Sequence, residues 1–175
     1  MANLTFGKVP HPGFLDRPID KPEGNGWDNL GKRQPKFVCL HRMIGSLRGT
    51  DAYFRLPSVG ALTDYGIGVE ATDGKADAGV IMRWNDPLGY RSGWASGPVS
   101  APYGDGACIV SKYGINAVNR DGVSIETSGN YDTPIDDFAF GELAKLCAYW
   151  CDFMKVPYDM MSANSAIGCS AFVWH

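Results

Sequence analysis

Two of the three histidines in the chain each close an apolar run. His41 ends the run Phe-Val-Cys-Leu-His at 37–41, and His175 ends the run Ala-Phe-Val-Trp-His at 171–175. Runs rich in aromatic and β-branched residues are typical of buried strands, so each imidazole is expected at the rim of a sheet. If the two strands lie close together, both imidazoles meet at one rim, and imidazole is a common zinc ligand. Two unrelated histidines at strand ends would give the same pattern.

The other candidate ligands are weaker. The third histidine, His11, lies between two prolines with no other ligand type beside it, so a structural or solvent-facing role is expected. Cys39 falls two residues before His41, on the same strand face, where it is either a metal partner or, more simply, a packed thiol. Cys169, six residues before His175, serves as a ligand only if the last loop doubles back.

Composition excludes several classes of protein. The chain has 175 residues, which fits one domain, and a net charge of −3, without the basic excess of a nucleic-acid binder. No apolar run approaches the length of a membrane span, and the first residues do not form a signal peptide. The five cysteines are scattered and odd in number, which predicts reduced thiols and synthesis in the cytoplasm.

Periodicity and turn residues predict the elements that would position these side chains. Residues 1–35 hold five prolines and are expected to form an irregular arm. The long helix is expected to begin after an N-cap at Thr133 and to place Cys147 and Cys151 in the core. The predicted elements are strands at 36–41, 64–69, 79–84, 107–110, 122–127 and 171–175, a short helix at 51–55 after Thr50, and a long helix at 134–154.

This order predicts an α/β fold with a single mixed central β-sheet flanked by helices. Residues 64–84 are expected to form a hairpin. Residues 85–107 form a long irregular stretch rich in Gly, Ser, Tyr and Trp, which suits either a wall around a sugar or peptide ligand or a packed surface loop.

Several short segments together resemble one known family. Residues 119–126 read Asn-Arg-Asp-Gly-Val-Ser-Ile-Glu, similar to a family segment Asn-x-x-Ser-Ile-Gly-Ile-Glu. The strand ending at His41, the strand at 64–69, and the long helix followed by Val-Pro-Tyr-Asp also match. The chain therefore resembles, over residues 36–175, the zinc-dependent N-acetylmuramoyl-L-alanine amidases, which include phage endolysins and share their fold with peptidoglycan recognition proteins.

The resemblance implies a zinc ion held by His41 and His175. The third ligand of that family, a Cys or an Asp, follows the second histidine after a short loop and is expected beyond residue 175. On this basis the amidase-like catalytic domain at 36–175 looks truncated at its C-terminal end, and a further C-terminal polypeptide piece could complete the site. Two histidines alone are a weak zinc site, because catalytic zinc normally has three protein ligands.

The resemblance also implies the catalytic and substrate-binding residues. Glu126 would accept the proton of the zinc-bound water, and Tyr65 would orient that water or donate to the oxyanion. Trp94, Tyr103 and Asn130 are candidate substrate contacts. The implied function is endolysin-like lysis of the bacterial cell wall by hydrolysis of the bond between N-acetylmuramic acid and L-alanine in peptidoglycan.

Two other functions stay open from the sequence. The first is a non-catalytic peptidoglycan-binding domain, or an inactive fragment, that lacks the third zinc ligand. The second is a cysteine hydrolase that uses Cys39 or Cys169, although neither cysteine has the strand-to-helix context that lowers a thiol pKa.

Overall fold

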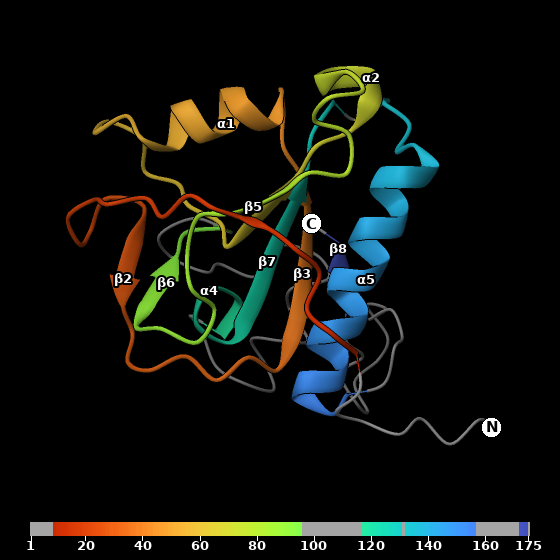
Figure 1. The fold of residues 1–175 in the computed structure, drawn as a ribbon. Coiled ribbons are helices and arrows are strands. Elements are labelled where there is room, and N and C mark those ends of the chain that lie inside the picture. Colours follow the sequence, from red (N-terminus) through yellow and green to blue (C-terminus); the bar gives the residue numbers. More distant parts are fainter. Residues whose placement is uncertain (1–8, 96–116, 131, 157–171, 175) are drawn as a thin grey trace.

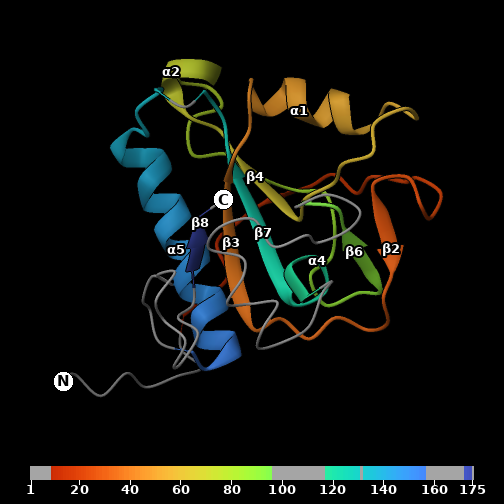
Figure 2. The ribbon, with the colours of Figure 1, turned by 180° about the vertical axis from the view of Figure 1, so that it is seen from behind.

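The chain is organised around one mixed β-sheet. The computed structural model describes residues 9–95, 117–130, 132–156 and 172–174. Six strands form the sheet in the order β1-β5-β4-β7-β3-β8, and all neighbours are parallel except β4 and β5. Figures 1 and 2 show β3 between β7 and β8. The strands are β1 (Leu15–Asp16), β3 (Phe37–Arg42), β4 (Tyr65–Ile67), β5 (Ile81–Arg83), β7 (Gly122–Thr127) and β8 (Phe172–Trp174).

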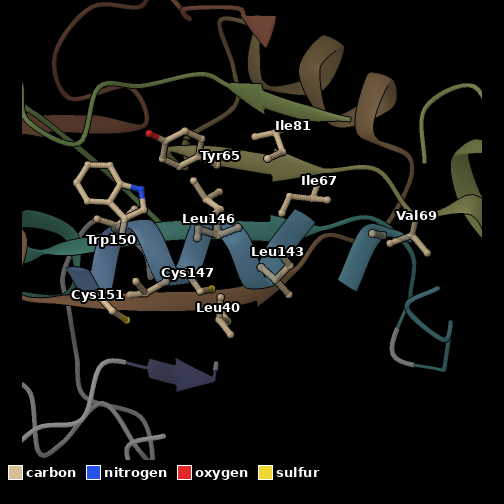
Figure 3. Packing of buried hydrophobic residues seen from close by; sticks show 14 residues of the cluster. Leu40, Tyr65, Ile67, Val69, Ile81, Leu143, Leu146, Cys147, Trp150 and Cys151 are labelled. Carbon is tan, nitrogen blue, oxygen red and sulfur yellow. The ribbon is translucent and has the colours of Figure 1, made fainter. Parts of the chain in front are cut away.

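One face of the sheet is covered by the long helix α5 (Asp137–Met154). Its N-cap is Asp136, whose carboxylate accepts the backbone N–H of Ala139 at 2.8 Å, and Lys155 ends it in the left-handed conformation. Figure 3 shows the core between this helix and the sheet. The cluster includes Val38, Leu40, Tyr65, Ile67, Ile125, Leu143, Leu146, Cys147, Trp150 and Cys151.

The opposite face is covered by α1 (Leu47–Phe54), whose N-cap Ser46 accepts the backbone N–H of Gly49 at 3.0 Å. A second hydrophobic cluster joins Leu47 and Phe54 to Met82 and Trp84. A short helix, α2 (Glu70–Asp73), follows β4. The sheet is therefore sandwiched between helices, as the sequence predicted.

A small second sheet lies beside the first. It pairs β2 (Trp27–Asn29) with β6 (Arg91–Gly93) in antiparallel register, and α4 (Ala117–Asp121) leads into β7. None of the described helices is both long enough and apolar enough to traverse a lipid bilayer.

The structure confirms the strands predicted at 36–41 and 122–127, the antiparallel pairing within 64–84, the terminal strand, and the placement of Cys147 and Cys151 in the core. It corrects other predictions. The arm at 1–35 is not wholly irregular, because β1 joins the main sheet and β2 the small one. The N-caps are Ser46 and Asp136 rather than Thr50 and Thr133. The predicted strand at 107–110 lies outside the described residues.

Candidate active site

His41 and Glu126 stand side by side on one face of the sheet. In the parallel register of β3 and β7, His41 pairs with Glu126 and Leu40 pairs with Ile125. Because side chains alternate between faces along a strand, His41 and Glu126 point away from α5, whereas Leu40 and Ile125 point into the core beneath it. The sheet therefore brings an imidazole and a carboxyl together near the carboxyl ends of two neighbouring strands.

Cys39 lies next to His41 on the same face. Its Sγ is 3.2 Å from Nε2 of His41, and both residues are buried, with 1% and 8% of their surface exposed. Burial, followed by the charges of Asp64 and Glu126, raises the pKa of Cys39 to about 12, so the thiol is neutral near pH 7 in the metal-free chain. This protonation state argues against a thiolate nucleophile at Cys39.

The carboxyl of Glu126 is poised near neutrality. Desolvation by burial raises its pKa to about 7 from an ordinary 4.5. Within the described parts of the chain, no hydrogen bond or ion pair holds this carboxyl. A carboxyl with such a pKa can accept and return a proton near neutral pH, which is the requirement for a general base.

A buried polar network supports the strand that carries Glu126. Arg33 donates two hydrogen bonds to the carboxylate of Asp64, at 2.6 and 2.9 Å, and both residues are almost wholly buried. Asp64 in turn accepts the backbone N–H of Ser124 at 2.9 Å, and its own N–H donates to Ser124 Oγ at 2.9 Å. The network joins the N-terminal segment to β7 two residues before Glu126.

Tyr65 lies on the other face of the sheet. It pairs with Ile125 in β7, whereas its neighbour Gly66 pairs with Glu126. The Tyr65 ring is buried in the cluster under α5, and its hydroxyl shares a hydrogen bond of 3.2 Å with Nε2 of His11. Burial raises the pKa of this phenol further above its usual range. The structure therefore does not bring Tyr65 to Glu126, contrary to the role expected from the resemblance.

The ring of Trp84, and not that of Tyr65, covers the face of β4 on which Glu126 lies. A Cβ added to Gly66 would lie 2.3 Å from the ring of Trp84, so only glycine lets this ring lie against the strand. The indole N–H of Trp84 donates to Asp51 at 2.9 Å, which fixes the ring to α1. An apolar wall thus stands on the strand next to Glu126, a feature that the sequence analysis missed.

Two of the three predicted substrate contacts, Trp94 and Asn130, fall within the described residues. Trp94 donates its indole N–H to Asp28 at 2.7 Å beside the small sheet, so its ring is held by that sheet. Asn130 is exposed at the carboxyl end of β7, and its backbone oxygen accepts Nε of Arg42 at 3.1 Å. Tyr103 and His175 lie outside the described residues.

A groove of about 250 Å³ lies just beyond the carboxyl end of β3. Its walls include Ile44 and Tyr53, which are 76% and 55% exposed. The backbone of Gly45 bridges to Gly129 after β7, so the groove adjoins the strand ends that carry His41 and Glu126. The sequence analysis missed this groove. The sequence shows an apolar Ile44 two residues after β3, but its exposure is known only from the structure.

The donors at this rim suit zinc in chemical type, since imidazole nitrogen, thiolate sulfur and carboxylate oxygen are its usual protein ligands. His41 and Cys39 already approach each other closely. No three His, Cys, Asp or Glu side chains gather into a metal site within the described ranges alone. A three-ligand site built on His41 therefore needs at least one ligand from outside those ranges.

Comparison with known proteins gives structural matches only. No family model and no curated protein matches the sequence. The endolysin N-acetylmuramoyl-L-alanine amidase LysCS from Clostridium intestinale is similar over 94% of this chain and 91% of its own, with a TM-score of 0.53 and 13% identity. The two proteins share a fold. The mixed α/β sheet of this chain is thus the amidase-type fold that the sequence predicted.

Two other solved structures show weaker likeness. A mutant endolysin from Bacillus subtilis matches 78% of this chain and 68% of its own, at 16% identity and a TM-score of 0.44. The Staphylococcus aureus hydrolase AmiA, solved with its ligand, matches 95% of this chain and 66% of its own, at 13% identity and a TM-score of 0.45.

Proposed function

We propose that this chain is a zinc-dependent peptidoglycan amidase that hydrolyses the amide bond between N-acetylmuramic acid and L-alanine. The observation that carries the proposal is the pairing of His41 with Glu126 on one face of the sheet, at its carboxyl rim. The fold shared with an endolysin amidase supports it. As in the endolysins, the substrate would be the bacterial cell wall.

His41 and His175 are the proposed zinc-holding histidines. The register of β8 on β3 supports this pair, because Leu40 lies opposite Trp174 and the next residues of the two segments are His41 and His175. Zinc held there would lower the pKa of a bound water to about 7 and polarise the scissile carbonyl.

Glu126 is the proposed general base and acid. Its carboxylate accepts the proton of the attacking water as the new C–O bond forms on the lactyl carbonyl of N-acetylmuramic acid. It then delivers that proton to the alanine nitrogen as the C–N bond breaks. A pKa near 7 allows both transfers at neutral pH, since neither protonation state is strongly disfavoured.

We propose that part of the substrate binds in the groove beyond the carboxyl end of β3. Ile44 and Tyr53 offer apolar and aromatic surface beside the strand ends, and an exposed aromatic ring suits a sugar or peptide chain. Tyr65 takes no part in this proposal, because it faces α5.

Product analysis of digested peptidoglycan tests the proposal. Purified cell wall is incubated with the chain and zinc, and the soluble products are identified by mass spectrometry and end-group labelling. We expect new α-amino groups on L-alanine and intact glycan strands. The Glu126→Gln variant, which keeps the size of the side chain, is the matched control and should release almost none.

New reducing sugar ends, or cleavage between amino acids of the stem peptide, would contradict the proposal. Tight sedimentation of the chain with the cell wall, without release of amino groups, would instead support a non-catalytic peptidoglycan-binding domain.

A further inference from the structure

Cys39 and His41 direct their side chains to a common point. They are two residues apart on β3, so they share a face, and their Sγ and Nε2 atoms are 3.2 Å apart. A neutral thiol that touches an imidazole nitrogen shares one proton between the two atoms. The lone pairs that bind this proton are the ones that would bind a metal ion in its place.

The separation of the two atoms is close to that of two ligands on one zinc ion. Zinc–sulfur bonds of about 2.3 Å and zinc–nitrogen bonds of about 2.0 Å, at a tetrahedral angle, place sulfur and nitrogen about 3.5 Å apart. The observed 3.2 Å therefore needs to open by only a few tenths of an ångström, which side-chain rotation supplies.

The electrostatic surroundings favour a cation at this point. The charges of Asp64 and Glu126 both act on Cys39, and both are negative. Arg33 offsets Asp64 through its two hydrogen bonds, which leaves Glu126 as the carboxyl whose charge a metal ion would balance. A dication beside the sulfur also removes the thiol proton, because coordination by zinc deprotonates a thiol.

We infer that Cys39 is a ligand of the zinc ion in this chain, together with His41. The inference rests on the proposed zinc site and names a ligand for it within the strand. Cys39, His41 and His175 would then supply three protein ligands, and Glu126 would stay beside the open position as the base. A sulfur ligand from β3 would distinguish this zinc site from one whose third ligand comes from a later part of the chain.

Cobalt substitution tests the inference. The metal-free chain is titrated with Co²⁺, and its absorption is recorded, because a thiolate ligand gives cobalt an intense near-ultraviolet charge-transfer band that nitrogen and oxygen ligands do not give. The test variant is Cys39→Ser. The matched control is Cys147→Ser, whose thiol is also buried but belongs to α5 and packs against the other face of the sheet.

We expect the band in the wild type and in Cys147→Ser, and its loss in Cys39→Ser. The zinc affinity of Cys39→Ser should fall by more than roughly 10- to 100-fold, which is the usual effect of losing a residue that only hydrogen-bonds to a metal ligand. Co²⁺ binding without the band in the wild type, or a band that survives in Cys39→Ser, would overturn the inference and leave the zinc amidase proposal standing. A wild type that binds neither Co²⁺ nor Zn²⁺ would overturn both.

If the Cys39→Ser variant does not fold, a second measurement on the wild type tests the inference. The ¹¹³Cd resonance of the cadmium-loaded wild type moves to much higher frequency when a thiolate is bound. A resonance in the range of nitrogen and oxygen ligands alone would overturn the inference without any substitution.

Discussion

His41 and Glu126 are direct partners in the parallel register of β3 and β7, so an imidazole and a carboxyl with a pKa of about 7 share one rim of the sheet. The pairing follows from the backbone and does not depend on a loop. It places a candidate metal ligand and a candidate proton acceptor on adjacent strands, about 5 Å apart in the backbone. Substitutions at this rim and on the opposite face of the sheet should therefore have different effects on catalysis.

Glu126→Gln should lower kcat for release of alanine amino groups about 10²- to 10⁴-fold, the usual contribution of a general base. Zinc content and the circular dichroism spectrum should stay those of the wild type, because Gln keeps the shape and His41 is untouched. Near-wild-type turnover by this variant would remove Glu126 from the mechanism.

Glu126 should also make the metal-free chain less stable at high pH. Its pKa is raised on folding, so its favourable contribution is present below about pH 4.5 and is lost as the pH rises through about 7. The difference from 4.5 to about 7 corresponds to about 3 kcal/mol, since one pKa unit is about 1.4 kcal/mol.

Denaturant unfolding in chelator should therefore find Glu126→Gln more stable than the wild type by up to about 3 kcal/mol at pH 8.5, as the pKa difference requires. The two proteins should be equal near pH 4. Equal stability at both pH values would show that the carboxyl is not desolvated.

Tyr65→Phe should leave catalysis nearly unchanged, because the ring points toward α5 and away from Glu126. The variant loses the hydrogen bond to His11, which should cost about 1 kcal/mol of unfolding free energy. Activity and thermal unfolding measured on one preparation decide the matter. A large fall in kcat with unchanged stability would place the phenol at the reacting atoms.

Asp51→Asn should destabilise the chain by about 2 kcal/mol at pH 7 and by little near pH 2. Burial alone would raise the pKa of this carboxyl, but hydrogen bonds from Arg55, Arg17 and Trp84 hold it at about 2. The contribution is therefore present above pH 3.8 and disappears as the pH falls through about 2.

Asp20→Asn is the matched control for Asp51→Asn. The side chain of Asp20 is 98% exposed in its ion pair with Arg91, and exposed pairs contribute little. Urea unfolding of both variants should separate them clearly at pH 7. If they lose the same stability, the anchoring of α1 through Asp51 is not significant.

The sequence predicted the elements with strong local patterns. The run ending at His41 is apolar up to that histidine, and the run ending at Thr127 alternates between apolar and polar residues; both became central strands. The spacing from Leu143 to Trp150 marked the buried face of α5. β1 and β2 were missed because each is held by pairing with a distant segment, β5 and β6, in a stretch whose prolines argue locally against strands.

The site was predicted in part for the same physical reason. Alternation along a strand tells which residues share a face, so Cys39 could be grouped with His41. It does not tell which face a second strand presents to the first. The role expected for Tyr65 came from the family resemblance alone, and in the register of β4 on β7 its neighbour Gly66 is the residue that pairs with Glu126. The polar network of Arg33 and Asp64 joins residues 31 positions apart and has no local signal.

Zinc stoichiometry of the purified chain tests the central claim most directly. The wild type and His41→Ala are stripped with a chelator, dialysed against zinc, passed through a desalting column, and assayed by elemental analysis alongside their circular dichroism spectra. We expect about one zinc per wild-type chain and almost none in a folded His41→Ala variant. A folded wild type without zinc, or a His41→Ala variant that keeps it, would contradict the claim that this rim is a zinc site.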